Sequence, residues 1–173
     1  MSFLDIVRLT AIALSFVVIV AGMALLLVDP SKLEGFFGGE GGLERIEFAT
    51  LRRDAPGKSF LACPPQRCPN AQPDAASPAF DIPVERLLGR LLEFVDGAAG
   101  VRTDNLDMER LQFVFLAPVP GEPAPDVVTV RLYPAAETGS TLAIYSRTLV
   151  GTPLRDRHER RVKRWLAALT PVG

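Results

Sequence analysis

The chain has few of the residues that most often carry catalysis or bind metal ions. Its 173 residues include one histidine and two cysteines, whereas a zinc site needs three or four such ligands. The serine elbow G-x-S-x-G, the zinc-binding helix H-E-x-x-H and a glycine-rich phosphate loop between a strand and a helix are all missing. We therefore expect no metal, no cofactor and no catalytic residue, and the sequence favours a binding protein over an enzyme.

A large charge excess is also missing. Nineteen Lys and Arg residues face twenty Asp and Glu residues, for a formal net charge of -1. This balance argues against a general nucleic-acid-binding protein, which needs a strong basic excess. The chain has no internal repeat, and its 15 prolines and 14 glycines predict many turns rather than a helical bundle.

Charge is absent altogether from one long segment near the N-terminus. Residues 9–28 read LTAIALSFVVIVAGMALLLV and are followed by Asp29 and Pro30. A helix of this length would be about 30 Å long, which matches the hydrocarbon core of a bilayer. A cleaved signal peptide has a shorter apolar core and a small-residue cleavage site, and a buried soluble helix is a third interpretation. We predict an uncleaved transmembrane anchor over residues 1–30.

The rest of the chain divides into a linker and one domain. Residues 31–43 are glycine-rich and predict a flexible linker, and residues 44–173 have the length of a single domain. Arg8 precedes the apolar segment and Lys32 follows it, a weak bias that favours a cytoplasmic N-terminus. We expect a single-pass protein of the bacterial inner (cytoplasmic) membrane with its C-terminal domain in the periplasm.

The two cysteines lie close together in the sequence CPPQRC, from Cys63 to Cys68. The spacing does not fit C-x-x-C-H for c-type haem or the C-x-x-C of most redox pairs. A structural disulfide needs only an oxidising compartment and a turn that brings the two Cα atoms within about 7 Å. A disulfide is favoured, and two free thiols are the alternative.

Two segments have the apolar spacing of an amphipathic helix. The first, Ile82–Val95, has Pro83 at a suitable first position and Asp81 as a candidate cap. The second begins near Thr152 and Pro153. The expected inward side chains are Val84, Leu87, Leu88, Leu91, Leu92 and Val95 in the first helix and Leu154, His158, Val162, Trp165 and Leu169 in the second.

Strand patterns fill most of the remaining domain. Their order around the two helices predicts an α+β fold, a small antiparallel sheet with both helices packed on one face. A long loop is expected over residues 64–78. The predicted strands are 110–117, 126–133 and 140–149, preceded by two shorter extended pieces over 44–51 and 58–62.

Basic residues are dense towards the C-terminus. Arg147 precedes six Arg or Lys residues within positions 155–164. Because the arginine fork suits phosphate and carboxylate groups, anionic lipid head groups beside a membrane are a candidate partner, and another membrane protein is the alternative. A solvated helix face is the simplest interpretation of the same residues, and His158 is expected to pack in the core. The candidate contact residues are Tyr145, Ser146, Arg147, Arg155 and Arg161.

Short motifs across positions 45–170 resemble the domain of unknown function 1499 family, short membrane-anchored proteins common in proteobacteria. The chain departs from the family pattern after Gly151, where members show an Asp-Leu-Gly-Val-Asn-like stretch and this sequence reads TPLRDRH. The resemblance implies a location and a fold rather than an activity. The matching motifs are FLACPP from Phe60, Cys68 with Pro73-Asp74 and Ser77-Pro78, Pro83 with its helix, Pro125-Asp126, Tyr145-Ser146-Arg147, Val150-Gly151, Arg161-Val162 and Trp165-Leu166-Ala167.

These observations predict a membrane-tethered extracytoplasmic module that recognises a lipid, an envelope component or a partner membrane protein. An accessory subunit of a larger membrane complex is the second hypothesis. An enzyme of the hydrolase type is the third hypothesis. The chain offers little for catalysis, because its one histidine lies on the predicted buried stripe of a helix and no nucleophile motif is present.

Thiol labelling of intact cells tests the predicted topology. We expect a membrane-impermeant reagent to label Cys63 and Cys68 only after reduction, because a periplasmic disulfide hides both thiols. Labelling by a permeant reagent alone, without reduction, would place free thiols in the cytoplasm and overturn the topology.

Overall fold

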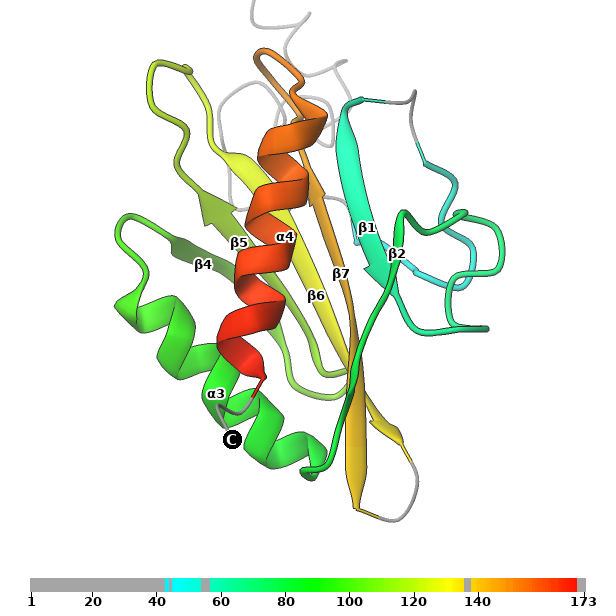
Figure 1. Ribbon diagram of the computed structural model, residues 1–173. Coiled ribbons are helices and arrows are strands. Elements are labelled where there is room, and N and C mark those ends of the chain that lie inside the picture. Colours follow the sequence, from blue (N-terminus) through cyan, green and yellow to red (C-terminus); the bar gives the residue numbers. More distant parts are fainter. Residues whose placement is uncertain (1–42, 44, 54–56, 136–137, 171–173) are drawn as a thin grey trace, which may run out of the picture. The chain divides into compact units, whose positions relative to one another are not determined.

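The computed structural model describes residues 43, 45–53, 57–135 and 138–170, and these residues form an α+β domain with a seven-stranded mixed sheet and two helices (Figure 1). The α+β class predicted from the sequence is confirmed. The strands are β1 (Ser59–Cys63), β2 (Ala75–Ala76), β3 (Ala79–Phe80), β4 (Arg102–Asp107), β5 (Gln112–Ala117), β6 (Asp126–Ala135) and β7 (Gly139–Arg147), and the helices are α3 (Val84–Gly97) and α4 (Arg155–Leu169).

The sheet has the strand order β2-β1-β7-β6-β5-β4, and β3 adds a short pairing to β7. Strands β5, β6 and β7 form the predicted antiparallel meander, with Val128 opposite Ser146. The prediction of a purely antiparallel sheet is wrong at one edge, where β1 and β2 are parallel. The loop after β1 turns the chain back on itself, so that Asp74 donates its amide to the Leu61 carbonyl and β2 runs beside β1 in the same direction.

Both helices pack on the same face of the sheet (Figure 1). Successive side chains of a strand point to opposite faces, so every second strand residue reaches this core. The largest contributors from β5 are Phe113 and Phe115, which have no exposed surface. Leu87 and Leu91 supply the stripe of α3 and are equally buried, while Leu88 lies at the edge of the core. The predicted inward face of the first helix is confirmed except at Leu92, which is half-buried and not part of this core.

Both helices begin later than the sequence suggested. Helix α3 starts at Val84, with Pro83 as the flanking residue and no side-chain cap, so the predicted cap at Asp81 is wrong. Helix α4 starts at Arg155, also without a side-chain cap. Thr152, the predicted cap, instead donates its amide to a Glu122 carboxylate oxygen.

The apolar stripe of α4 is confirmed except at its first member. Leu154 precedes the helix in an extended conformation and its side chain is 52% exposed. The remaining stripe residues are all buried: His158, Val162, Trp165 and Leu169.

Among the described residues, coil and not a helix covers the opposite face of the sheet. The predicted strand over residues 44–51 is wrong over 45–51, which contain a turn and no strand. Polar contacts hold this segment in place, because the Gln112 amide donates to the Ile46 carbonyl and Arg131 pairs with Glu47. Phe48 is fully buried beneath it, beside Tyr145 of β7.

The cysteine pair lies on this second face, with the two sulfur atoms at disulfide distance. The Cα atoms of Cys63 and Cys68 are 6.3 Å apart and both side chains are buried. Gln66 adopts a φ of 69° within the loop, a left-handed conformation that tightens the turn. The predicted long loop over residues 64–78 holds the two-residue strand β2 near its end.

Strand β4 was not predicted from the sequence. Its six residues, RTDNLD, are polar apart from Leu106 and almost entirely exposed. Such a sequence lacks the apolar alternation that identifies a half-buried strand. Pairing with β5 makes it a strand, at the open edge of the sheet.

Neither of the two described helices has the length and hydropathy that crossing a bilayer requires. The apolar segment over residues 9–28 and the linker over 31–42 lie outside the described residues, so the anchor stays a prediction.

Two leucine substitutions test the assignment of the core. Leu87→Ala removes a fully buried side chain, and we expect a loss of about 2–5 kcal/mol in the free energy of unfolding. Leu106→Ala makes the same chemical change on a side chain that is 49% exposed, and about 0.5 kcal/mol or less is expected. Urea unfolding of the purified chain measures both, and equal losses would contradict the packing described.

Candidate functional site

A cluster of polar side chains is enclosed between the sheet and α4. Asp126 is the first residue of β6, and Ser146 lies near the end of β7 on the same face as the helices. The antiparallel register pairs Val127 with Arg147, so Thr148, the residue after β7, lies near Asp126. Arg157 and Arg161, one turn apart on α4, extend towards the sheet and contact Asp126. We call this group the Asp126 cluster: Asp126, Ser146, Thr148, Arg157, His158 and Arg161.

Asp126 is the centre of the cluster and its side chain is 1% exposed. It accepts hydrogen bonds from Arg157 at 2.8 and 3.1 Å and from Arg161 at 2.7 Å. The Thr148 hydroxyl donates a further bond at 2.6 Å. Burial by itself would raise the pKa of Asp126, but these bonds from Arg157, Thr148 and Arg161 outweigh it and hold the pKa below the usual 3.8. The carboxylate is therefore charged, paired and inaccessible.

The hydrogen bonds define the protonation state of His158. Because Thr148 donates its proton to Asp126, its oxygen must accept from His158 Nε2, at 3.0 Å. Nδ1 then accepts from the Ser146 hydroxyl at 3.0 Å, and the Ser146 oxygen accepts from Arg161 at 3.1 Å. Burial lowers the pKa of His158 to about 4, although Asp126 opposes the shift. A neutral imidazole with its proton on Nε2 satisfies every partner.

The Ser146–His158 pair resembles part of a hydrolase site but is not arranged for catalysis. Ser146 has no exposed surface, so its hydroxyl cannot reach a substrate carbonyl. Asp126, which would orient the imidazole in a triad, is instead neutralised by two guanidinium groups. The cluster fastens α4 to the sheet.

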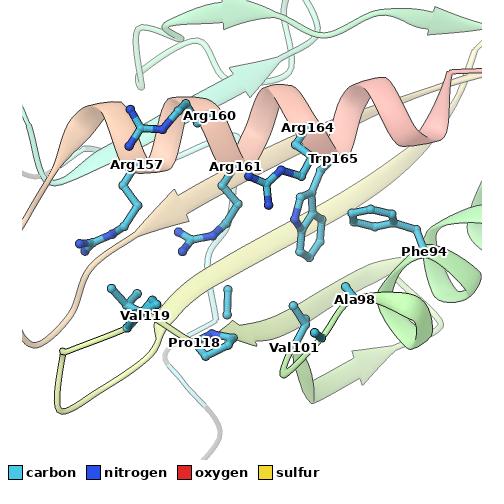
Figure 2. Close-up of a pocket in the computed structure, with 13 residues that line it drawn as sticks. Phe94, Ala98, Val101, Pro118, Val119, Arg157, Arg160, Arg161, Arg164 and Trp165 are labelled. Atoms are coloured by element: carbon cyan, nitrogen blue, oxygen red, sulfur yellow. The ribbon is translucent and has the colours of Figure 1, made fainter.

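A groove of about 480 Å³ runs alongside α4, next to this cluster (Figure 2). Its walls come from the end of α3, the connection after β5 and one flank of α4. Trp165 lies edge-on to Phe94, with ring centroids 5.3 Å apart, and closes one end of the floor. Apolar side chains dominate this floor: Phe94, Ala98, Val101, Ala117, Pro118, Val119 and Trp165. We call it the α4 groove.

Four arginines of α4 line the same groove. Arg157 and Arg161 are committed to Asp126 and present only part of their guanidinium surface. Arg164 extends over the groove in Figure 2, whereas Arg160 points along the outer side of the helix. Within the described part of the chain, neither Arg160 nor Arg164 forms an ion pair or a side-chain hydrogen bond, and both are exposed. The groove thus joins an apolar floor to a cationic rim.

The five contact residues expected from the sequence are divided between different surfaces. Tyr145 and Ser146 are adjacent on β7 and point to opposite faces, and both are buried. Arg147 lies on the Tyr145 side, 5.9 Å from the ring centroid. Only Arg161 lines the α4 groove, where it contacts Ser146. Arg155 belongs to a separate hollow.

That second hollow, of about 550 Å³, is polar and is held by ion pairs. Asp74 binds Arg53 at 2.6 Å and Arg155 at 3.0 Å, and it also accepts the Leu61 amide at 2.9 Å. Arg53 and Arg155 thus share one carboxylate, and Arg52 also lines this hollow. The α4 groove has two arginines outside the ion pairs of the described residues, Arg160 and Arg164, and it has the more apolar floor.

Asp126, Thr148 and Arg157 were not among the candidate contact residues, although Pro125-Asp126 was one of the motifs in the family resemblance. The sequence did contain a signal for a buried carboxylate. Asp126 is the first residue of a strand with alternating apolar residues, and it lies on the face of that strand that points to the core. A carboxylate at such a position requires a buried cation, and the arginine-rich helix was its natural source.

No protein-family model, no curated protein and no solved structure matches the chain at a significant level. The resemblance to the domain of unknown function 1499 family stays a prediction.

The pH dependence of stability tests the neutral His158. Its pKa is about 4 in the folded protein and 6.5 in ordinary surroundings, so the unfolded chain binds more protons between these values. Stability is therefore complete above pH 6.5 and falls as the pH drops towards 4. Between pH 7 and 4.5 we expect a loss of about 2–3 kcal/mol in the free energy of unfolding.

The variant His158→Gln provides the comparison for that experiment. It is less stable at pH 7, yet it should lose little further stability down to pH 4.5, because the titrating group is gone. Urea unfolding at several pH values measures both proteins. Parallel pH profiles for the two would show that His158 is not the responsible group.

Proposed function

We propose that this chain is a membrane-tethered periplasmic binding module, and that its α4 groove takes an amphiphile with an anionic head group. The tether rests on the apolar segment over residues 9–28. The ligand class is inferred from one observation. The α4 groove combines an apolar floor with two arginines, Arg160 and Arg164, that form no ion pair with the described residues. A phosphate or carboxylate head would bind the guanidinium groups, and an alkyl chain would cover the floor.

The size and the shape of the groove support this ligand class. A volume of about 480 Å³ lies in the usual range for small-molecule sites, roughly 300–1,000 Å³. The floor around Trp165 and Phe94 offers aromatic surface to an alkyl chain. Arg164 has no carboxylate partner in the described part of the chain, so an anion arriving there replaces only water.

A second candidate function is an accessory subunit of a larger membrane complex. The edge strand β4 favours it, because no further strand of the described residues pairs with its outer side and a strand from another chain could be added there. Leu106 and Met108 are exposed at this edge and would be covered by such a partner.

Fluorescence titration tests the α4 groove, because Trp165 is the only tryptophan of the chain and lies in its wall. We expect octyl phosphate to change the Trp165 emission at lower concentration than octyl glucoside, which has the same tail and no charge. Arg164→Gln should weaken octyl phosphate binding by about tenfold or more, since a charge-assisted hydrogen bond contributes about 1.5–3 kcal/mol.

The matched control is Lys163→Gln, which removes one positive charge from the same turn of α4. Lys163 is paired with Glu159 and does not line the groove, so binding should stay within about twofold. Titration with inorganic phosphate distinguishes a lipid-like ligand from a small anion. If inorganic phosphate binds as tightly as octyl phosphate, the site is one for small anions. Equal binding of octyl glucoside and octyl phosphate would contradict an anionic ligand altogether.

A further inference from the structure

Three arginines of the α4 groove lie in one row along the helix. Arg157, Arg161 and Arg164 are separated by four and by three residues, the spacing that places side chains one above another on a helix. All three line the groove and lie on the side of α4 that faces it (Figure 2). No acidic side chain of the described residues lines the groove with them. An anion in the groove would therefore meet guanidinium groups along one whole flank.

These three arginines share a single carboxylate. Asp126 accepts hydrogen bonds from Arg157 at 2.8 Å and from Arg161 at 2.7 Å. Arg164 is exposed and forms no ion pair with the described residues. His158, which lies between the two inner arginines and the sheet, is neutral because burial lowers its pKa to about 4. Three positive charges and one negative charge leave two positive charges unmatched at this flank.

The two inner guanidinium groups are held in fixed orientations. Arg157 uses Nε and Nη2 for its bonds to Asp126 and Thr148, and Arg161 uses Nη1 for Asp126 and Ser146. The remaining nitrogens, Nη1 of Arg157 and Nε and Nη2 of Arg161, have no hydrogen-bond partner among the described residues. Because these donors are already held in place, little side-chain freedom is lost when an anion binds them.

A phosphomonoester matches this flank better than the other common anionic head groups do. Its second pKa of about 6 gives it close to two negative charges at neutral pH, whereas a phosphodiester, a carboxylate or a sulfate ester has one. It has three terminal oxygens that can each accept from a different guanidinium group, and a carboxylate has only two. The wall of the groove opposite the arginines carries Val101, Pro118 and Val119, which suit an alkyl chain.

We propose that the α4 groove selects a doubly charged phosphomonoester head group, bound by Arg157, Arg161 and Arg164, over head groups that carry a single negative charge. This inference rests on the function proposed above, because it specifies the ligand of the same groove. Each of the two unmatched positive charges of the flank then has a negative counterpart on the ligand.

Octyl phosphate and octyl sulfate test this selection, because they share the tail and the three terminal oxygens and differ in charge. The full chain is held in nanodiscs of phosphatidylcholine, and Trp165 emission follows binding. Discs without protein measure the ligand that enters the lipid. At pH 7.5 we expect octyl phosphate to bind about fivefold more tightly or better, the effect of one more unit charge about 4 Å from a cation in water. Equal dissociation constants would overturn the inference and leave an anionic amphiphile as the ligand.

The pH dependence of binding separates the charge of the ligand from its shape. Between pH 7.5 and 5.5 the doubly charged fraction of octyl phosphate falls about fourfold, and its affinity should fall by the same factor. Octyl sulfate keeps its charge, so its affinity should stay within about twofold. The titratable groups beside the arginines are Asp126, with a pKa below 3.8, and His158, with a pKa of about 4, and the other walls add none among the described residues. A parallel loss for octyl sulfate would assign the pH dependence to the protein and contradict the inference.

Arg164→Gln removes one unmatched charge without disturbing the bonds to Asp126. The preference for octyl phosphate over octyl sulfate should then fall to about twofold or less. Lys163→Gln removes a charge outside the groove and should keep the full preference. A full preference retained in Arg164→Gln would refute the assignment to three guanidinium groups.

Failure of the proposed function gives a different set of results. If octyl phosphate and octyl sulfate both bind no more tightly than octyl glucoside, the groove takes no anion, and the proposed function and this inference are both wrong. If inorganic phosphate binds as tightly as octyl phosphate while octyl sulfate binds more weakly, the selection of a doubly charged phosphate stands and the amphiphile is wrong.

Discussion

One buried carboxylate determines how α4 lies on the sheet. Asp126 is almost completely removed from water, and an unpaired charge at such depth would cost several kcal/mol. Arg157 and Arg161 compensate it, one turn apart on the helix, and they can do so only at one rotation and one position of α4. The neutral state of His158 and the hydroxyl orientations of Ser146 and Thr148 follow from that pairing. The cluster therefore defines a unique packing rather than adding one more contact.

The basic character of α4 serves two purposes that the sequence alone does not separate. The arginines on its inner flank compensate Asp126, while Arg160 and Arg164 lie towards solvent and line the groove. Arg157 and Arg161 belong to both groups, because each binds Asp126 and also lines the groove. Structural and proposed binding roles thus meet in one helix, and a change at Arg157 would alter stability and binding together.

Elements with a strong apolar period could be predicted, and elements without one could not. Helix α3 and strands β5, β6 and β7 carry their own pattern, because one face of each is buried in the same core. Strand β4 has no such pattern and depends on its pairing with β5. The segment over 45–51 resembled a strand because Ile46 and Phe48 alternate with Arg45 and Glu47, yet it forms a turn from which Phe48 is buried. Leu154 matched the helical spacing but precedes the first turn, since the connection bends at Gly151.

The sequence by itself determined the α+β class, the buried faces of both helices and the nearness of the two cysteines, because these follow from local spacing and short chain length. It also carries the predicted membrane anchor in residues 9–28. Tertiary structure alone decided the site. Asp126 meets Arg157 and Arg161 across 31 and 35 residues of chain, and the α4 groove is assembled from three separate segments. Contacts at such separations depend on how the layers pack, and no local pattern encodes them.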